Sequence, residues 1–372
     1  MTTTINNEHK KLNVPNLRFP EFQGEWEKCK LSDFCTFFSG GTPSSSNKDF
    51  YGGNIAFIRS GELHANSTEL LITQDGYDNS SAKMVEVGDL LLAMYGATSG
   101  DIAISKIKGA INQAILCIRT NQNKKFIESV WNKHVSKILR KYLQGGQGNL
   151  SADIVKSISF SFPTLKEQEK IANLISLLDE RITTQSKIID KLQSLIKGIA
   201  QKIVHSNKPN VCLSECLECK TSTLQESDVC EHGVYPVYGA NGIVGYLDNY
   251  NTEGEAVYII KDGSGVGTVS YVTGKCSATG TLNTLQAKEG YSLQYLYYLL
   301  KVFNFEPYKT GMAIPHIYFK DYGKAKVFCP SYTEQLRYAR LLSAIDNKLS
   351  IEQNILTELR LQKQYLLRQM FI

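Results

Sequence analysis

The segment PTLKEQEKIANLISLLDERITTQSKIIDKLQSLIKGIAQKIV at residues 163–204 has a counterpart of the same design at residues 330–371, PSYTEQLRYARLLSAIDNKLSIEQNILTELRLQKQYLLRQMF. Both segments begin with the pattern Pro-x-x-x-Glu-Gln, at Pro163 and at Pro330. A repeat of this kind indicates repeated structural units. We therefore expect two globular heads, each followed by a helix of the same design, and an approximate internal two-fold. Further identities fall at Ala172 and Ala339, Leu174 and Leu341, Asp179 and Asp346, and Leu192 and Leu359.

Each copy predicts one long helix with an apolar seam. Aliphatic residues recur in alternating steps of three and four, which is the pattern of a coiled coil. A stripe about 60 Å long, at about 1.5 Å per residue, needs a partner surface. We expect the two helices to bury their seams against each other as an antiparallel pair; the alternative is that each helix packs on its own head. The expected seam positions are Ile175, Leu178, Ile182, Gln185, Ile189, Leu192 and Ile196, with Leu342, Ile345, Leu349, Glu352, Leu356 and Leu359.

Two of these seam positions are polar, and the repeat places them opposite each other in the alignment. Gln185 in the first helix aligns with Glu352 in the second. A polar residue in a seam commonly sets the register of the helices at some cost in stability. The pair is therefore expected to specify how the helices align.

The segments before each helix predict an α+β fold with two β-rich α/β heads. Each head has short apolar runs broken by glycine turns, then a helix (125–143 or 293–303), a loop (144–151 or 310–316) and a final strand. We expect a flexible tail at 1–18, heads at 19–162 and 207–329, and helices at 163–206 and 330–372. The two long helices separate the heads as an antiparallel coiled coil with an internal pseudo-two-fold.

Composition is ordinary for a globular chain. The net charge of +5 permits a nucleic-acid partner without arguing for one. No apolar run approaches about 20 residues, so we expect no membrane span. Nine cysteines lack framework spacing, and the N-terminal stretch lacks an apolar leader, so reduced thiols in a cytoplasm are expected.

The cysteines near the start of head two allow two interpretations. Cys212, Cys216 and Cys219 have spacing that resembles a zinc site. However, the residues 213–215 align with 31–33 of head one, which puts Cys216 and Cys219 where head one has phenylalanines. We therefore favour small buried residues of an early helix and expect no metal site.

A glycine-rich stretch in head two, Gly263-Ser-Gly265-Val-Gly267, also has two interpretations. It could cradle a phosphate, but a dinucleotide site needs a helix after the glycines. The residues 268–272 predict another strand instead. A tight β-turn with its backbone near a ligand or a groove is the favoured interpretation.

Catalytic motifs are not recognised in this sequence. It has no Gly-x4-Gly-Lys-Ser/Thr loop, no Asn/Asp-Pro-Pro-Tyr/Phe segment, and no histidine at convincing triad spacing from a nucleophile. We therefore expect no catalytic residue in this chain. A basic stretch in head one is either a solvated helix face or a contact for DNA phosphates: Lys124, Lys125, Lys133, His134, Lys137, Arg140 and Lys141.

At this point the chain resembles the specificity subunits of Type I restriction–modification systems. The resemblance covers nearly the whole chain. It is carried by the opening Leu17-Arg-Phe-Pro20-Glu-Phe-x-Gly24-Glu-Trp26, the repeated Pro-x3-Glu-Gln motif, the stretch 236–246 with 259–263, and the Gln-Met-Phe ending. Each motif is moderately specific; their order together with the repeat is highly specific.

The resemblance implies a DNA-recognition subunit without chemistry of its own. Each head would be a target-recognition domain that reads one half of a bipartite, asymmetric site in double-stranded DNA. The helices would set the spacer length and dock two modification (methyltransferase) subunits, which carry S-adenosylmethionine. Restriction subunits, which use ATP and Mg²⁺, would join the same complex. The competing hypotheses are an enzyme that acts alone and a coiled-coil scaffold whose heads bind protein.

Base-reading residues are expected on loops at the DNA-facing edge of each head, because base contacts specify and phosphate contacts position. Turn capping or simple solvent exposure is the alternative for each of them. The candidates in head one are Arg59, Ser60, Tyr95, Thr98, Gln113, Gln147 and Asn149. Those in head two are Tyr238, Asn241, Lys261, Ser264, Asn283 and His316.

Overall fold

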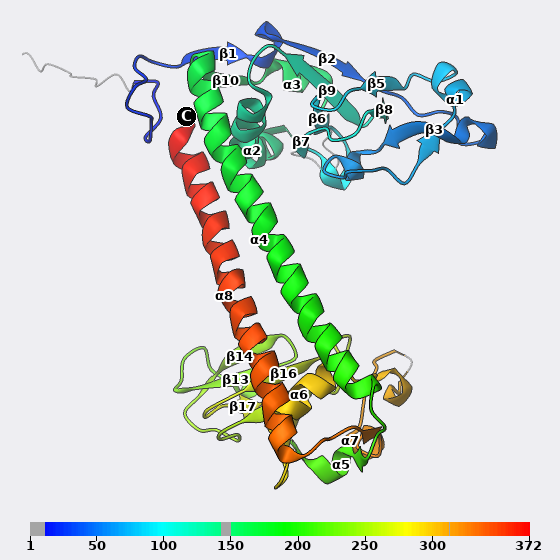
Figure 1. The fold of residues 1–372 in the computed structure, drawn as a ribbon. Helices are drawn as coiled ribbons and strands as arrows, with labels where there is room; N and C mark the ends of the chain where they lie inside the picture. Colours follow the sequence, from blue (N-terminus) through cyan, green and yellow to red (C-terminus); the bar gives the residue numbers. More distant parts are fainter. Residues whose placement is uncertain (1–11, 143–149, 312) are drawn as a thin grey trace, which may run out of the picture. The chain divides into compact units, whose positions relative to one another are not determined.

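The computed structural model describes residues 12–142, 150–311 and 313–372 (Figure 1). The chain divides into two compact units. Unit 1 comprises Met1–Thr184 and Thr357–Ile372, and unit 2 comprises Gln185–Leu356. Each unit therefore holds one head together with a part of both long helices.

Head one is built from short strands and three α-helices. Its strands are β1 (Glu27–Lys30), β2 (Cys35–Ser39), β3 (Tyr51–Ile58), β4 (Leu71–Ile72), β5 (Lys83–Val85), β6 (Leu90–Ala93), β7 (Ile102–Ile104), β8 (Gly109–Ile111), β9 (Ile115–Thr120) and β10 (Ser159–Phe162). Its helices are α1 (Gln74–Asp78), α2 (Lys124–Tyr142) and α3 (Ala152–Ser157).

Head two uses a similar set of elements. Its strands are β11 (Val211–Cys212), β12 (Leu217–Thr221), β13 (Tyr235–Gly239), β14 (Gly242–Leu247), β15 (Ala256–Ile260), β16 (Val269–Val272), β17 (Ser277–Ala278), β18 (Leu282–Ala287) and β19 (Lys326–Val327). Its helices are α5 (Leu213–Cys216), α6 (Leu293–Val302) and α7 (Phe319–Tyr322).

The main sheets of the two heads share one topology. The main sheet has the order β2-β9-β6-β7 in head one and β12-β18-β15-β16 in head two, and all neighbours in both are antiparallel. A second sheet contains a parallel pair in each head, β3 with β8 and β13 with β17. The strand before each long helix pairs with the first strand of its head, β10 with β1 and β19 with β11. The prediction that the heads share a plan is confirmed at the level of strand order.

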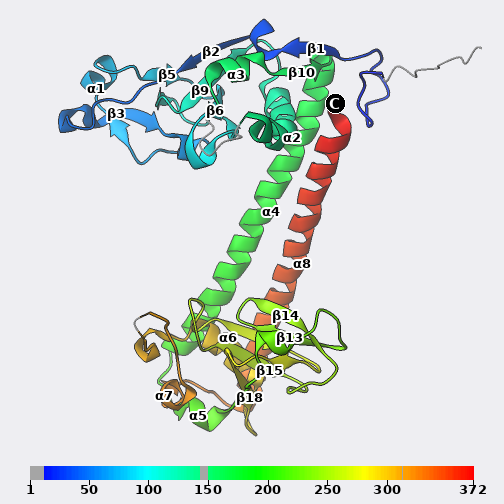
Figure 2. The ribbon, with the colours of Figure 1, turned by 180° about the vertical axis from the view of Figure 1, so that it is seen from behind.

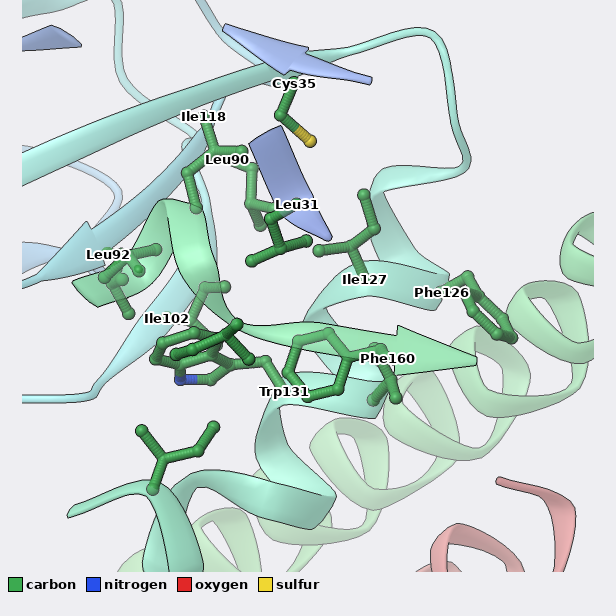
Figure 3. Close-up of a cluster of buried hydrophobic side chains, with 14 of the residues drawn as sticks. Leu31, Cys35, Leu90, Leu92, Ile102, Ile118, Phe126, Ile127, Trp131 and Phe160 are labelled. Carbon is green, nitrogen blue, oxygen red and sulfur yellow. The ribbon is translucent and has the colours of Figure 1, made fainter. Parts of the chain in front are cut away.

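The central strand of each main sheet is buried on both faces. In β6, Leu90 and Leu92 point into the core beside α2, while Leu91 and Ala93 point into a second core. Successive side chains of a strand alternate between faces, so a continuous apolar run suits a strand covered on both sides. Figure 3 shows the α2 side of this arrangement, where Trp131 lies fully buried next to Phe160.

The long helices have the predicted extent. Helix α4 spans Leu165–His205 and α8 spans Tyr332–Met370, so each begins two residues after its proline. Within unit 1 the two segments run antiparallel, with the C-terminus beside the first turns of α4 in both views (Figures 1 and 2). Within unit 2, Gln185 of α4 contacts Glu352 of α8. The predicted pair of long helices is confirmed.

The expected seam positions are covered within each unit. Seam residues of unit 1 are buried or half-buried: Ile175, Leu178, Ile182 and Leu359. Those of unit 2 are buried or half-buried as well: Gln185, Ile189, Leu192, Ile196, Leu342, Ile345, Leu349, Glu352 and Leu356. Burial of such a stripe stabilises the pair by roughly 25 cal/mol for each Å² of apolar surface removed from water.

The repeated glutamine joins each long helix to its head. Nε2 of Gln168 donates to the carbonyl oxygen of Pro163, and Nε2 of Gln335 donates to that of Pro330, both at 2.9 Å. The side-chain oxygens accept from the N–H of Asn123 (3.2 Å) and of Ser292 (2.8 Å), the residues before α2 and α6. Both glutamines are buried. The motif therefore fixes the start of a head helix against the start of a long helix, which explains its repetition.

The repeated glutamate differs between the copies. Glu167 is buried and accepts from Nε of Arg18 at 2.8 Å and from the indole N–H of Trp26 at 3.3 Å. Its counterpart Glu334 is exposed and accepts from Ser331. Arg18 belongs to the segment expected as a flexible tail, so the C-terminal part of that segment is held by side-chain contacts with α4.

The glycine-rich stretch and the early cysteines of head two were each given a favoured interpretation above. Gly263 and Gly267 have φ of +95° and +91° in the turn between antiparallel strands β15 and β16. The N–H groups of Val266 and Thr268 donate to Gly263 and Gly265, so the β-turn is confirmed, while its nearness to a ligand or a groove stays a prediction. Cys216 ends α5 and is fully buried, with its sulfur 3.8 Å from that of Cys329. Cys219 lies in β12 and not in a helix, because the chain becomes extended directly after Cys216. Among the described residues, no group of three or more potential metal ligands lies together.

Candidate nucleic-acid interface

The parallel strand pair of head one brings two predicted base readers to one sheet edge. Strands β3 and β8 pair at Ile58 and Ile111, and parallel strands end on the same side of a sheet. Arg59 follows β3 directly, and Gln113 lies two residues after β8. Both side chains are exposed, and the amide oxygen of Gln113 accepts from the hydroxyl of Thr42 at 2.5 Å. Ser60, next to Arg59, is half-buried.

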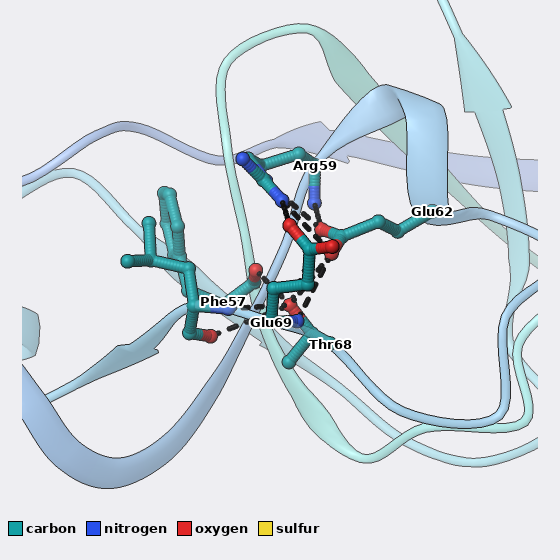
Figure 4. A network of polar contacts seen from close by, with 6 residues as sticks. Phe57, Arg59, Glu62, Thr68 and Glu69 are labelled. Atoms are coloured by element: carbon teal, nitrogen blue, oxygen red, sulfur yellow. Dashed lines mark hydrogen bonds and ion pairs between the residues drawn. The ribbon is translucent and has the colours of Figure 1, made fainter. Parts of the chain in front are cut away.

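Arg59 is held by two carboxylates (Figure 4). Its Nε and Nη2 donate to Glu62 at 3.1 and 3.0 Å, and Nη2 also donates to Glu69 at 3.0 Å. Burial raises the pKa of Glu62, but hydrogen bonds from the Arg59 side chain and from backbone N–H groups outweigh it and lower that pKa to about 2. Thr68 also donates to Glu62. The guanidinium is therefore oriented before any ligand arrives, and its outer partner Glu69 is exposed to solvent.

A second candidate region lies where the central strand of head one ends. The N–H of Met94 donates to Ala114, and the N–H of Leu150 donates to Met94. These bonds hold the segment after β6 beside Ala114 and Leu150. That segment carries Tyr95 and Thr98, which are both half-buried. Gln147 and Asn149 were predicted in the loop before Leu150, but they lie outside the described residues.

The equivalent region of head two gathers three predicted readers. Here the N–H of Lys261 donates to Thr281 and the N–H of Ile317 donates to Lys261, which repeats the backbone pattern around Met94. Nδ1 of His316 lies 3.2 Å from Oδ1 of Asp262. The N–H of Gly263 donates to Pro315, so the turn that carries Ser264 lies against the loop that carries His316. Lys261, Ser264 and His316 thus share one edge.

Tyr238 and Asn241 lie at the carboxyl end of β13, one strand of head two's parallel pair. Tyr238 pairs with Ala278 and packs its ring 5.7 Å from that of Tyr258. Burial raises the pKa of Tyr238. Asn241 is exposed in the turn before Gly242, whose φ is +99°. Of this pair, Asn241 is the more accessible.

One predicted reader is misplaced. Asn283 was expected on a surface loop, but it lies within β18 at 2% exposure. Its side-chain N–H donates to the hydroxyl of Tyr322 at 3.0 Å. The expectation that Asn283 reaches a surface is wrong, because the strand continues through this position and a buried amide needs an internal partner.

Part of the basic stretch of α2 is engaged by other residues of unit 1. Lys133 donates to the carbonyl oxygens of Arg368 and Phe371, and burial lowers its pKa. It therefore covers the C-terminal end of α8, where cations are favourable. Burial likewise lowers the pKa of His134. Lys124 donates to the carbonyl oxygen of Gly88.

The more exposed residues of this stretch border a hollow of about 480 Å³. Lys137 and Lys141 line it from α2, and Lys28 lines it from β1. Arg140 is exposed and donates to the backbone of Ser136. Of the original set, Lys137, Arg140 and Lys141 remain available to phosphates, and Lys28 adds a cation from outside that set.

Sequence reasoning missed a cluster of tyrosines in unit 2. Tyr271, Tyr297 and Tyr298 lie beside Asp346 around a hollow of about 370 Å³. The available signals were the abundance of tyrosine after residue 205 and the identity of Asp346 with Asp179 in the repeat. Neither signal indicates contact without the tertiary structure.

The sequence pattern of the family described as "Type I restriction modification DNA specificity domain" matches residues 23–194 and 206–361. Among the described residues, no helix is long and apolar enough to cross a membrane.

Two curated relatives carry specificity-subunit names. The chain is 26% identical to the Type I restriction enzyme MjaVIII specificity subunit of Methanocaldococcus jannaschii, over 50% of this chain and 43% of that protein. It is 28% identical to the Type I restriction enzyme EcoprrI specificity subunit of Escherichia coli, over 31% of this chain and 29% of that protein. The matches therefore span less than half the length of these relatives.

A solved structure has the same fold over nearly the whole chain. The S subunit of a Type I restriction-modification system from M. genitalium superposes with a TM-score of 0.69 at 18% identity. The match covers 96% of this chain and 99% of that one. At this identity the likeness concerns the fold.

Proposed function

Because this chain belongs to the Type I restriction modification DNA specificity domain family, we propose that it is the DNA-recognition subunit of a Type I restriction–modification complex. Each head would read one half of a bipartite, asymmetric site in double-stranded DNA. The chain would contribute recognition, and its partners would contribute the chemistry.

The observation that carries the proposal is the repetition of one topology with different residues at the same edge. Both heads place polar side chains where the central strand of the main sheet ends, after the same backbone hydrogen bonds at Met94 and Lys261. Head one offers Tyr95 and Thr98 there, and head two offers Lys261, Ser264 and His316. Different donor and acceptor sets on one scaffold suit the reading of two different half-sites.

The partners follow from the proposed role. Two modification subunits would dock on the long helices and would bind S-adenosylmethionine. Restriction subunits in the same complex would use ATP and Mg²⁺. No residue of this chain is assigned a catalytic part, and the mild net charge of +5 leads us to expect weak binding to DNA by this subunit alone.

Methylation mapping tests this proposal. The chain is expressed in cells with the methyltransferase encoded beside it, and modified bases are mapped across the genome. We expect one bipartite motif with two short, different half-sites around a fixed gap. A continuous motif would contradict the assignment of one half-site to each head. Turnover by the purified chain alone, with DNA, Mg²⁺ and a methyl donor, would support an enzyme instead.

The salt dependence of DNA affinity distinguishes the proposed function from a scaffold function. A DNA-reading complex releases counterions when it binds, so its affinity falls steeply as salt rises. The complex of this chain with its methyltransferase should show that dependence. A scaffold whose heads bind protein would show no salt-dependent affinity for DNA.

A further inference from the structure

The internal repeat allows one head to serve as a reference for the other. Gln168 binds the residue before α2, Asn123, and Gln335 binds the residue before α6, Ser292. Helices α2 and α6 therefore start at equivalent places. Two residues further along each helix, Lys125 of head one corresponds to Gln294 of head two.

In unit 1 the repeated aspartate is paired with two lysines. Oδ2 of Asp179 lies 2.8 Å from Nζ of Lys125, and Oδ1 lies 2.5 Å from Nζ of Lys363. Lys125 comes from the head helix α2 and Lys363 from the opposite long helix α8. The carboxylate is thus neutralised by cations of the chain itself.

In unit 2 the corresponding cations are missing. The counterpart of Asp179 is Asp346, and the residues at the two lysine positions are Gln294 and Ile196. The carboxylate of Asp346 accepts one hydrogen bond, from the hydroxyl of Tyr298 at 3.2 Å. Over the part of the chain that the structure describes, Asp346 forms no ion pair. The carboxylate of Asp179 is therefore paired with cations, whereas the equivalent carboxylate of Asp346 is not.

Asp346 borders a hollow suited to a flat cation. Tyr271, Tyr297 and Tyr298 line the hollow of about 370 Å³ together with Asp346 and Gln294. The rings of Tyr271 and Tyr297 lie 5.4 Å apart, and those of Tyr297 and Tyr298 lie 4.9 Å apart. Aromatic faces next to a carboxylate attract guanidinium groups through stacking and cation–π interactions.

Two further features set the charges around this hollow. The hydroxyl of Tyr271 lies beside the carboxylate of Glu255. Burial raises the pKa of Tyr271, and the hydrogen bond with the carboxylate of Glu255 raises it further. The rings of Tyr297 and Tyr298 already attract one cation of the chain, since Nζ of Lys301 lies 5.1 and 5.9 Å from their centroids.

We propose that this hollow is a docking site for an arginine side chain of the modification subunit. The proposal rests on the proposed function, because it names a contact through which that partner would recognise head two and helix α8. Charge complementarity argues for the occupant: the site offers a carboxylate without an ion partner and aromatic faces. The negative charge of Asp346 would repel a DNA phosphate, so DNA is not the expected occupant.

The test uses a variant that copies head one. Gln294→Lys places a lysine at the position of Lys125, where it should pair with Asp346. We expect this variant to unfold at a higher temperature than the parent chain and to bind the purified modification subunit at least about 10-fold more weakly. Because its fold is stabilised, weaker binding cannot be attributed to unfolding.

Asp346→Asn provides the complementary change and should also weaken binding about 10-fold or more. Asp190→Asn removes one negative charge from an exposed position of α4 in the same unit and serves as the matched control. It should bind like the parent. Affinity is measured by titration calorimetry with full-length chains.

The outcomes separate this inference from the proposed function. Parental affinity in both Gln294→Lys and Asp346→Asn would overturn the docking site while leaving the proposed function intact. A change in self-association of this chain without a change in binding to the modification subunit would point to a second copy as the occupant and would also overturn the inference. A parent chain that yields a bipartite methylation motif but loses it in Gln294→Lys would support both.

Discussion

The side chain of Gln185 donates to its own counterpart in the repeat, Glu352. Nε2 of Gln185 lies 3.0 Å from the backbone oxygen of Glu352 and also contacts the carboxylate. The two side chains are 8% and 6% exposed. The polar exceptions of the two seams therefore bond to each other inside unit 2, in the register that the repeat defines, and the carboxylate of Glu352 also pairs with Lys348 of its own helix.

Removing one member of this pair should destabilise the chain, and removing both should not. Gln185→Leu leaves the buried carboxylate of Glu352 without its amide donor, so we expect thermal unfolding several degrees below the parent. In Gln185→Leu with Glu352→Leu the seam becomes apolar, which is often neutral or stabilising. Scanning calorimetry of the three chains measures this. Equal melting of the single variant and the parent would show that the pair contributes nothing.

The repeated glutamines should act within their own units. Gln335→Ala leaves the N–H of Ser292 and the carbonyl of Pro330 without their partner, at a cost of about 1–3 kcal/mol. Gln168→Ala should have a similar effect in unit 1. Gln364→Ala, at an exposed position of α8, is the control. Hydrogen exchange should show faster opening at the start of α6 in Gln335→Ala but not in Gln168→Ala.

The Asp179 cluster should make the stability of unit 1 depend on pH. Burial raises the pKa of Asp179, but Lys125 and Lys363 outweigh it, so the folded pKa lies below its usual value of 3.8. A depressed carboxyl pKa gives stability that is fully present above the unfolded pKa and is lost as pH falls through the folded one. Asp179→Asn should cost about 1.5–3 kcal/mol at pH 7.

The difference in unfolding free energy between the parent and Asp179→Asn should disappear in acid. Denaturant unfolding of parent and Asp179→Asn should differ by a constant amount above about pH 5 and converge below about pH 4. Asp190→Asn should follow the parent at every pH. A gap that persists unchanged at pH 3 would mean that the charge of Asp179 is not its cause.

Arg59 provides a test of the candidate interface in head one. Arg59→Ala should weaken binding to the methylated motif by about 1–3 kcal/mol if the guanidinium reads a base. Glu69→Gln removes its outer carboxylate and should strengthen DNA binding. Lys108→Ala removes a similar charge from an exposed site and should change little. Affinities are measured with the methyltransferase present and at fixed salt. A parental affinity in Arg59→Ala would exclude Arg59 from the interface.

A change in helix length tests the proposed spacer function. Insertion of one heptad into α4 and one into α8 preserves the seam and lengthens each helix by about 10 Å, or about three base pairs of DNA. Methylation mapping should then find the same half-sites around a gap longer by about that amount. Retention of the original gap would contradict the idea that the helices set it.

The sequence by itself determined the parts of this protein that depend on period and repetition. A seam with steps of three and four admits one helical face, so the extent of α4 and α8 and the burial of Leu342 and Ile189 could be predicted from spacing alone. The repeat likewise predicted that both heads follow one plan.

Only the tertiary structure decided which side chains meet. Asn283 and Lys133 are polar residues that sequence reasoning placed on a surface, yet one bonds Tyr322 in the core and the other covers the end of α8. Asp179 and Asp346 are the same residue in the repeat, but one faces two lysines and the other faces tyrosines. Such partners come from segments far apart in the chain, and a local pattern carries no information about them.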